Sequence, residues 1–206
     1  MSRTAPAVFV VDDDPAVLQS LSRLLRSAGL TVTTFSSPRE FLERHDPRLP
    51  GCLVLDLAMP GLNGLELQQA LVARGHELAI VFLTGHGDIP MSVQAMKRGA
   101  LDFLTKPVND DDLLKAVHVA IEQDRLQRQS RAEVAEIEQR LATLTPGERE
   151  VLEHVISGQL NKQTAAELGT VEKTIKVHRA RVMEKMKVQS VAELVRLTER
   201  AGLRTP

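Results

Sequence analysis

The feature that most constrains the fold is an alternation, over the first 121 residues, of short apolar runs with longer amphipathic stretches. Stretches with the leucine spacing of helices, such as 16–29 and 64–75, separate the apolar runs. Strand–helix alternation predicts a parallel sheet with helices on both faces, and unbroken apolar runs are typical of strands buried on both faces. The five expected strands are VFVV (8–11), TVTTF (31–35), CLVLD (52–56), AIVFLT (79–84) and LDFLT (101–105).

Beyond the fifth strand the pattern is helical throughout. Residues 109–143 contain neither glycine nor proline, and Asn109 suits the N-terminus of a helix. The apolar spacing thins after Ile121, which predicts a charged helical linker. This linker either continues the preceding helix or breaks between Gln127 and Ser130. The chain is thus expected to divide into residues 1–121, a helical linker over 122–143 and a helical domain over 144–206.

Four helices are expected in this last domain, over 145–158, 161–169, 171–186 and 190–202. Thr145, Asn161 and Ser190 stand where an N-cap residue would accept a hydrogen bond from the first turn. Thr170 is the expected cap of the third helix.

Charge is distributed unevenly between the two ends of the chain. Residues 1–121 hold 11 Lys and Arg against 14 Asp and Glu, whereas residues 142–206 hold 11 against 8. This mildly basic end permits a nucleic-acid partner without requiring one. The single cysteine, Cys52, cannot form an internal disulfide and is expected to be a buried, inert thiol, which suits the cytoplasm. Neither a signal peptide nor a membrane-spanning segment is expected.

Polar side chains stand where the predicted strands end. Asp12 and Asp13 follow the first strand, Asp56 ends the third, Thr84 ends the fourth, and Lys106 follows the fifth. The carboxyl ends of parallel strands meet along one edge, where ligands of such sheets bind. Three carboxylates there predict an all-oxygen cation site of the kind that Mg²⁺ prefers, and a cation would offset their mutual repulsion.

A hydroxyl and an ammonium directed at the same point suit the transfer of a phosphoryl group, whose oxygens develop charge. Asp56 would be the nucleophile, since carboxylates form acyl phosphates. A cis Lys106–Pro107 bond would fix the approach of the lysine. Each of these residues taken singly is an ordinary strand-end residue, so the prediction rests on their combination.

The motifs VDDDP, LVLDLAMPGLNG, FLTGHGD and FLTKP, in this order, resemble the receiver domain of bacterial two-component response regulators over residues 6–121. The resemblance implies a flavodoxin-like, doubly wound fold and phosphorylation of Asp56 by a sensor histidine kinase. It also implies Mg²⁺ held by Asp12, Asp13, Asp56 and the backbone carbonyl of Ala58.

The same resemblance implies a conformational switch. The hydroxyl of Thr84 would turn toward the phosphoryl group while the ring of Phe103 moves inward, although Phe103 replaces the tyrosine common in the family. A plain core position for Phe103 is the alternative. The face formed by the helix after Thr84 and the strand carrying Phe103 would then form a homodimer.

An enzyme is the rival interpretation. Asp12-x-Asp14 after an apolar strand also matches the nucleophile motif of the haloacid-dehalogenase phosphatases, with Asp12 as nucleophile and Lys106 as its partner. The acidic pair that such a fold requires would then be NDDD at 109–112, which suits a helix start better. We therefore expect a phosphoacceptor with at most self-catalysed phosphotransfer and dephosphorylation, not an enzyme.

In the basic end, two short helices joined by GTV (169–171) predict a helix-turn-helix whose second helix enters the major groove of DNA. Ile175, Val182 and Met186 share one face and would pack on the bundle. The residues that lie away from this face could contact phosphates or base edges; they are Lys173, Thr174, Lys176, Val177 and Arg181. A plain helical bundle with a solvated, lysine-rich face fits this segment about equally well.

The segment LTPGEREVLEHVISGQLNKQTAAELG…KTIKVH resembles the LuxR-type helix-turn-helix, and the whole chain then resembles the FixJ/NarL subfamily. This resemblance implies that Lys176 and Val177 face bases, with His178 and Arg179 nearby, and that the helix over 190–202 forms a dimer contact. The sequence departs from the family pattern at Thr164, where an apolar residue is usual, and at TV (170–171), where an apolar residue and a serine are usual.

The chain is therefore expected to be a phosphorylation-controlled, DNA-binding transcription regulator. Its expected partners are a sensor histidine kinase, a second copy when phosphorylated, a roughly palindromic double-stranded DNA site and RNA polymerase, with no membrane. A receiver whose helical end binds protein is the remaining alternative, and salt-dependent binding to duplex DNA would separate the two.

Overall fold

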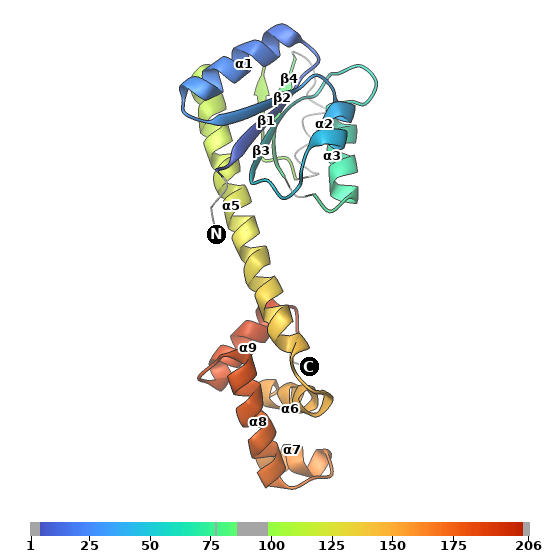
Figure 1. The fold of residues 1–206 in the computed structure, drawn as a ribbon, viewed down its shortest axis with the longest axis vertical. Helices are drawn as coiled ribbons and strands as arrows, with labels where there is room; N and C mark the ends of the chain where they lie inside the picture. The colour runs from blue at the N-terminus through green and yellow to red at the C-terminus, as the bar shows by residue number, and fades with distance from the viewer. Residues whose placement is uncertain (1–4, 77, 86–98, 204–206) are drawn as a thin grey trace. The chain divides into compact units, whose positions relative to one another are not determined.

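The computed structural model describes residues 5–76, 78–85 and 99–203. The chain forms two compact units, Met1–Arg128 and Gln129–Pro206. The first contains the sheet, and the described part of the second is helical (Figure 1). Within the described ranges, no helix combines the length and the apolar character that a membrane crossing needs.

The first unit is built on a parallel sheet, as the strand–helix alternation predicted. Five strands are found among the described residues, in the order β2-β1-β3-β4-β5. The three inner strands are buried along their whole length, because they are covered on both faces. The bounds are β1 (Ala7–Val11), β2 (Thr31–Phe35), β3 (Gly51–Asp56), β4 (Ala79–Thr84) and β5 (Asp102–Thr105).

Helices lie on both faces of this sheet (Figure 1). On one face, α1 (Pro15–Ser27) and the N-terminal part of α5 pack on a core that includes Leu25, Val54 and Val117. On the other face, α2 (Pro38–Arg44) and α3 (Gly64–Ala73) pack on a core that includes Phe41, Leu55 and Leu71. The short helix α2 was not predicted from the sequence, and the helix expected after Thr84 lies outside the described residues. Cys52 is buried, as expected, and burial raises the pKa of its thiol to about 12.

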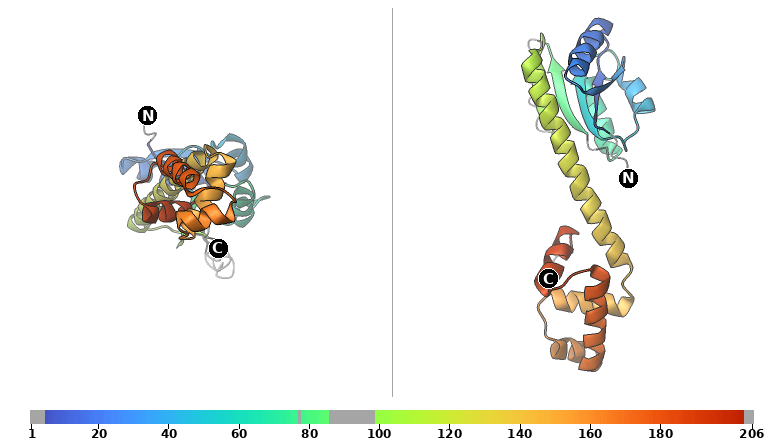
Figure 2. Two further views of the ribbon diagram at one scale, coloured as in Figure 1. Left: turned by 90° about the horizontal axis from the view of Figure 1, so that it is seen from below. Right: turned by 60° about the vertical axis from the view of Figure 1, so that its left-hand side comes forward.

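The helix α5 (Asp110–Ala142) runs without a break from the first unit into the second, which Figure 2 shows as one green-to-yellow ribbon. Asn109 begins it, since its Oδ1 accepts hydrogen bonds from the backbone of Asp111 and Asp112. The continuous linker helix is therefore confirmed, and the alternative break between Gln127 and Ser130 is wrong.

A buried ion pair fastens α5 to the first unit. The carboxylate of Asp124, which is 1% exposed, accepts a hydrogen bond from the backbone of Gly51 at 3.0 Å. The single Nε–H of Arg128 is shared between the two carboxylate oxygens, at 2.8 and 2.9 Å. The remaining nitrogens of Arg128 donate to three carbonyls that precede β3, those of Pro47, Arg48 and Leu49. Arg128 is also the last residue of the compact first unit.

The second unit contains four further helices among the residues that the structure describes. They are α6 (Pro146–Ile156), α7 (Asn161–Glu167), α8 (Glu172–Met186) and α9 (Val191–Arg200). Their apolar faces surround one core with the end of α5. Ile175, Val182 and Met186 of α8 are buried in it, as their spacing predicted.

Two of the predicted helix caps in this unit are confirmed and two are wrong. Thr145 caps α6 in a reciprocal arrangement with Glu148, and Ser190 caps α9. The N-cap of α7 is Leu160 rather than Asn161, and the N-cap of α8 is Val171 rather than Thr170; neither makes a side-chain capping hydrogen bond. The side chain of Gln163 accepts from the backbone of Leu160 in α7 instead.

Candidate functional site

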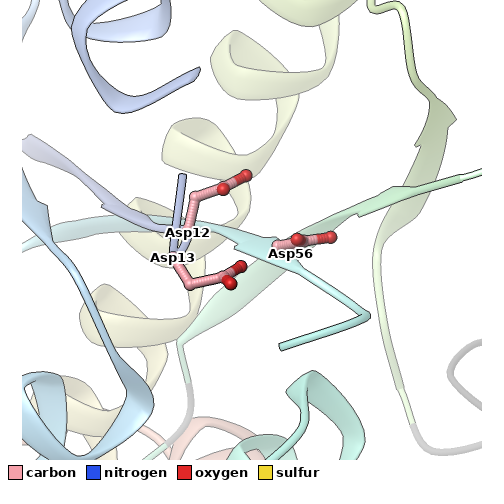
Figure 3. Close-up of side chains that lie close together, drawn as sticks. All are labelled: Asp12, Asp13 and Asp56. Carbon is pink, nitrogen blue, oxygen red and sulfur yellow. The ribbon is translucent and has the colours of Figure 1, made fainter. Parts of the chain in front are cut away.

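The carboxylates predicted from the strand ends lie together. Figure 3 shows Asp12 and Asp13 at the end of β1 and Asp56 at the end of β3. One ligand oxygen from each lies within 4.8 Å of the others. Asp12 is fully buried and Asp56 is 5% exposed, whereas Asp13 faces solvent. The group therefore has the chemistry of a cation site that is open on one side.

The neighbouring Asp14 has a different role. Its side chain accepts a hydrogen bond from the backbone of Ala16 at 2.8 Å and so caps α1. The backbone of Asp14 in turn donates to Asp12 at 2.9 Å. Of the three consecutive aspartates, one is thus engaged by the helix and two remain at the site.

Lys106 joins the two buried carboxylates. Its Nζ lies 2.7 Å from Oδ2 of Asp12 and 3.0 Å from Oδ2 of Asp56. The Lys106–Pro107 peptide bond is cis, as the sequence suggested. The lysine therefore stands beside the oxygen that would act as nucleophile.

These contacts shift the acid–base properties of the site. Burial raises the pKa of Asp56 above its ordinary value, and the charge of Asp12 adds to this effect, while Lys106 opposes it. Burial alone would lower the pKa of Lys106, but hydrogen bonds and attraction to Asp12 and Asp56 raise it overall. Lys106 is therefore a permanent cation near neutral pH, and a further cation beside Asp56 would favour its ionised form.

Thr84, at the end of β4, is 2% exposed, and its hydroxyl donates to the carbonyl of Gly85 at 3.2 Å. Phe103 of β5 is 41% exposed, so its ring does not occupy the core in this structure. The backbone N–H of Ala58 donates to Asp56 at 3.3 Å. The expected roles of these three residues remain predictions.

Glycine at position 64 lets α3 begin beside the site. A Cβ on Gly64 would lie 2.5 Å from the backbone oxygen of Asp56, which is closer than van der Waals contact allows. The backbone of Gly64 donates to Leu57 at 3.1 Å. Sequence reasoning did not single out this glycine, although it lies within the quoted motif LVLDLAMPGLNG.

The predicted DNA-contacting residues all lie on α8, but they differ in exposure. Lys173, Lys176, Val177 and Arg181 are exposed, while Thr174, His178 and Arg179 are half-buried. Nζ of Lys176 lies 2.9 Å from Glu172 one turn earlier. Their roles in DNA binding remain predictions.

The departure from the family pattern at Thr164 has a simple physical solution. Thr164 is 1% exposed, and its hydroxyl donates to the carbonyl of Leu160 at 3.3 Å. A polar side chain therefore fills the apolar position without leaving an unpaired hydroxyl.

Comparison with known families assigns both units. Residues 8–118 match the family "Response regulator receiver domain", and residues 142–198 match "Bacterial regulatory proteins, luxR family". Both matches agree with the motifs quoted above. Neither is a family of phosphatases.

Relatives match over nearly the whole chain. Nodulation protein W of Bradyrhizobium diazoefficiens is 48% identical over 97% of this chain and 88% of its own, and the response regulator protein TodT of Pseudomonas putida is 46% identical over the same shares. The solved structure of the response regulator StyR is 48% identical, covers 95% of this chain and 99% of its own, and has a TM-score of 0.85. Full-length FixJ from B. japonicum is 45% identical, with coverages of 98% and 99% and a TM-score of 0.59.

These relatives agree with both features of the structure in the family that they indicate. The two features are the carboxylate site at the end of the parallel sheet and the helix-turn-helix unit. This chain belongs to the two-component response regulators with a LuxR-type DNA-binding domain, and it is a phosphorylation-controlled transcription regulator rather than an enzyme.

Proposed function

We propose that Asp56 is the residue that accepts the phosphoryl group, from the phosphohistidine of a sensor kinase. The observation that carries this proposal is the position of Asp56, which is nearly buried between Asp12, Asp13 and the ammonium of Lys106, 3.0 Å away. Asp12 suits this role less well, because its side chain is fully buried, whereas Asp56 keeps 5% of its surface exposed.

In the proposed reaction, a carboxylate oxygen of Asp56 attacks the phosphorus atom. The new bond is O–P, the bond that breaks is the N–P bond of the phosphohistidine, and the electron pair returns to the imidazole. Lys106 stabilises the negative charge on the transferred group, and Thr84 would donate its hydroxyl to one phosphoryl oxygen.

The cation that fits the site is Mg²⁺, held by Asp12, Asp13, Asp56 and the carbonyl of Ala58. Three carboxylate oxygens within 4.8 Å of one another suit a hard divalent ion. When bound, Mg²⁺ would neutralise the charge that gathers on the phosphoryl oxygens. Lys106 alone supplies one positive charge to two buried carboxylates.

Phosphorylation would then act through Thr84 and Phe103. The ring of Phe103, which is exposed in this structure, would move inward once the hydroxyl of Thr84 turns toward the phosphoryl group, which shifts an existing equilibrium between two conformations. We further propose that the active form is a homodimer. The α8 helices of the two copies would contact the two halves of a roughly palindromic DNA site. The DNA-bound dimer would then recruit RNA polymerase in the cytoplasm. The proposal includes a functional division of the chain into a phosphoacceptor domain over residues 1–121, a helical linker over 122–143 and a DNA-binding domain over 144–206.

Intact-mass measurement tests the acceptor. The protein is incubated with acetyl phosphate and Mg²⁺, in parallel with Asp56→Asn and with the exposed control Asp112→Asn. We expect a single phosphoryl adduct on wild type and on the control, and none on Asp56→Asn or after removal of Mg²⁺ by chelation. An adduct that survives Asp56→Asn would disprove the assignment.

A further inference from the structure

A side-chain hydrogen bond joins the two helices of the helix-turn-helix. Nη1 of Arg179, on α8, donates to Oδ1 of Asn161, the first residue of α7, at 3.0 Å. Both side chains are half-buried. The contact links residues 18 positions apart, so it fixes the guanidinium relative to α7 as well as to its own helix.

Asn161 is available for this contact because it does not cap α7. The N-cap position belongs to Leu160, whose backbone N–H is bound by the side chain of Gln163 at 2.9 Å. The amide oxygen of Asn161, which would otherwise accept from the first turn of α7, accepts from Arg179 instead.

The chemistry of the pair differs from that of an ion pair. Arg179 has five N–H donors in a planar fork, and Asn161 is a neutral acceptor. Their hydrogen bond therefore orients the guanidinium and leaves its charge uncancelled. Lys176, by contrast, has its ammonium 2.9 Å from the carboxylate of Glu172.

We propose that Asn161 is a positioning residue for DNA binding, which holds Arg179 so that it contacts a backbone phosphate rather than a base edge. The proposal rests on the proposed DNA-binding function of α8. Arg179 is half-buried and its guanidinium is tied to α7, whereas the side chains of Lys176, Val177 and Arg181 are exposed and, among the described residues, make no hydrogen bond with α7 that would hold them away from the base edges. A cation oriented in advance loses less side-chain freedom on binding, and phosphate contacts set the register of the recognition helix.

The test measures dissociation constants of the full chain, treated with acetyl phosphate and Mg²⁺, for two duplexes. One duplex is selected by the wild-type protein from a random pool, and the other is a scrambled sequence of the same length. Each constant is measured between about 50 and 200 mM salt, the range in which phosphate contacts dominate the change in affinity. The variants are Asn161→Ala, Arg179→Ala and the double variant, with the exposed Gln189→Ala as the control.

We expect Arg179→Ala to weaken binding to both duplexes by a similar factor, about tenfold, and to reduce the salt slope by about 1. Asn161→Ala should weaken binding by about threefold to tenfold, and the double variant should be no weaker than Arg179→Ala. Gln189→Ala should match wild type. Circular dichroism of each variant establishes that α7 and α8 remain folded.

Two results would overturn the inference while leaving DNA binding intact. The first is an Arg179→Ala variant that loses preference for the selected duplex with an unchanged salt slope, because Arg179 would then read a base. The second is additivity of the two substitutions, because Asn161 would then act independently of Arg179. Absence of salt-dependent binding by wild type would instead refute the proposed function itself.

Discussion

The two ends of the chain carry their functional residues in different ways. In the first unit, side chains from three strand ends converge on one point, and the proposed nucleophile Asp56 lies within a few ångströms of its acidic neighbours and of Lys106. In the second unit, the candidate residues are spread along the exposed side of one helix. The buried members of a convergent site depend on one another, because the ammonium of Lys106 offsets part of the charge of both Asp12 and Asp56. A surface whose contacts are spread along one helix is expected to lose only part of its affinity for DNA with each single substitution.

The largest effect should come from the convergent site. Lys106→Met removes the only ammonium that contacts Asp12 and Asp56 among the described residues, and we expect phosphoryl-adduct formation to slow by about 10²-fold. The control is Lys115→Met, whose exposed ammonium is 3.8 Å from Asp112. The time course of the phosphorylated mass measures the rate. Equal rates for both variants would mean that the lysine is not part of the reaction.

A second effect concerns where the first unit ends. Arg128→Met leaves Asp124 buried without its cation, and we expect this to destabilise the first unit by about 3 kcal/mol. Arg125→Met, on the same helix, removes an exposed pair with Glu122 and should lower the free energy of unfolding much less, because water screens this pair. Urea unfolding followed by circular dichroism measures both values. Similar costs would show that the buried pair does not anchor α5.

The two units should also differ in their response to acid. Burial, followed by repulsion from His76, lowers the pKa of His45 from 6.5 to about 4. His45 therefore binds a proton less readily in the folded chain than in the unfolded chain. The stability of the first unit falls as pH falls from about 6.5 to about 4. We expect the free energy of unfolding to fall by about 1–2 kcal/mol. This is less than the full pKa shift implies, because the ring is partly exposed and solvent screens its charge.

In the second unit, a hydrogen bond from Lys185 and one from the backbone of Thr145 hold the pKa of Glu148 at about 2, against 4.5 in the unfolded chain. Its stabilising effect is complete above pH 4.5 and is lost as pH falls toward 2. Calorimetry across pH should show the first unit weakening before the second. His45→Phe should remove the pH dependence of the first unit, and Glu148→Gln should remove that of the second. Loss of stability by both units at the same pH would contradict the assignment of these two residues.

The smallest effect separates a real helix cap from an apparent one. Thr145→Ala removes the hydroxyl that accepts from Glu148 in α6, and we expect a loss of about 1 kcal/mol. Thr170→Ala should change stability little, because Val171 rather than Thr170 precedes α8 as its N-cap. Thermal unfolding of the two variants measures the difference. A larger effect at Thr170 would restore the cap predicted from the sequence.

The sheet and its site could be predicted because both follow from pattern. Continuous apolar runs mark the buried strands, and a parallel sheet brings all of its carboxyl ends to one edge, so Asp12, Asp56 and Lys106 had to lie close together. The short helix α2 could not be found in this way, since its seven residues span about two turns.

Helix starts and side-chain ties were harder to predict. Asn161 and Thr170 are residue types that favour N-caps, but the backbone places Leu160 and Val171 there. The choice depends on tertiary contacts, including that of Asn161 with Arg179. The spacing of Asp124 and Arg128 at i and i+4 was visible in the sequence, but their burial depends on the loop before β3.

The most direct test of the central claim joins the two units in one measurement. Fluorescence anisotropy of a labelled duplex, selected by the wild-type protein, gives the dissociation constant before and after treatment with acetyl phosphate and Mg²⁺. If phosphorylation of Asp56 controls DNA binding, wild type should bind about tenfold more tightly or better after treatment, and Asp56→Asn should not change. An unchanged constant for wild type, or an equal gain for Asp56→Asn, would contradict the account.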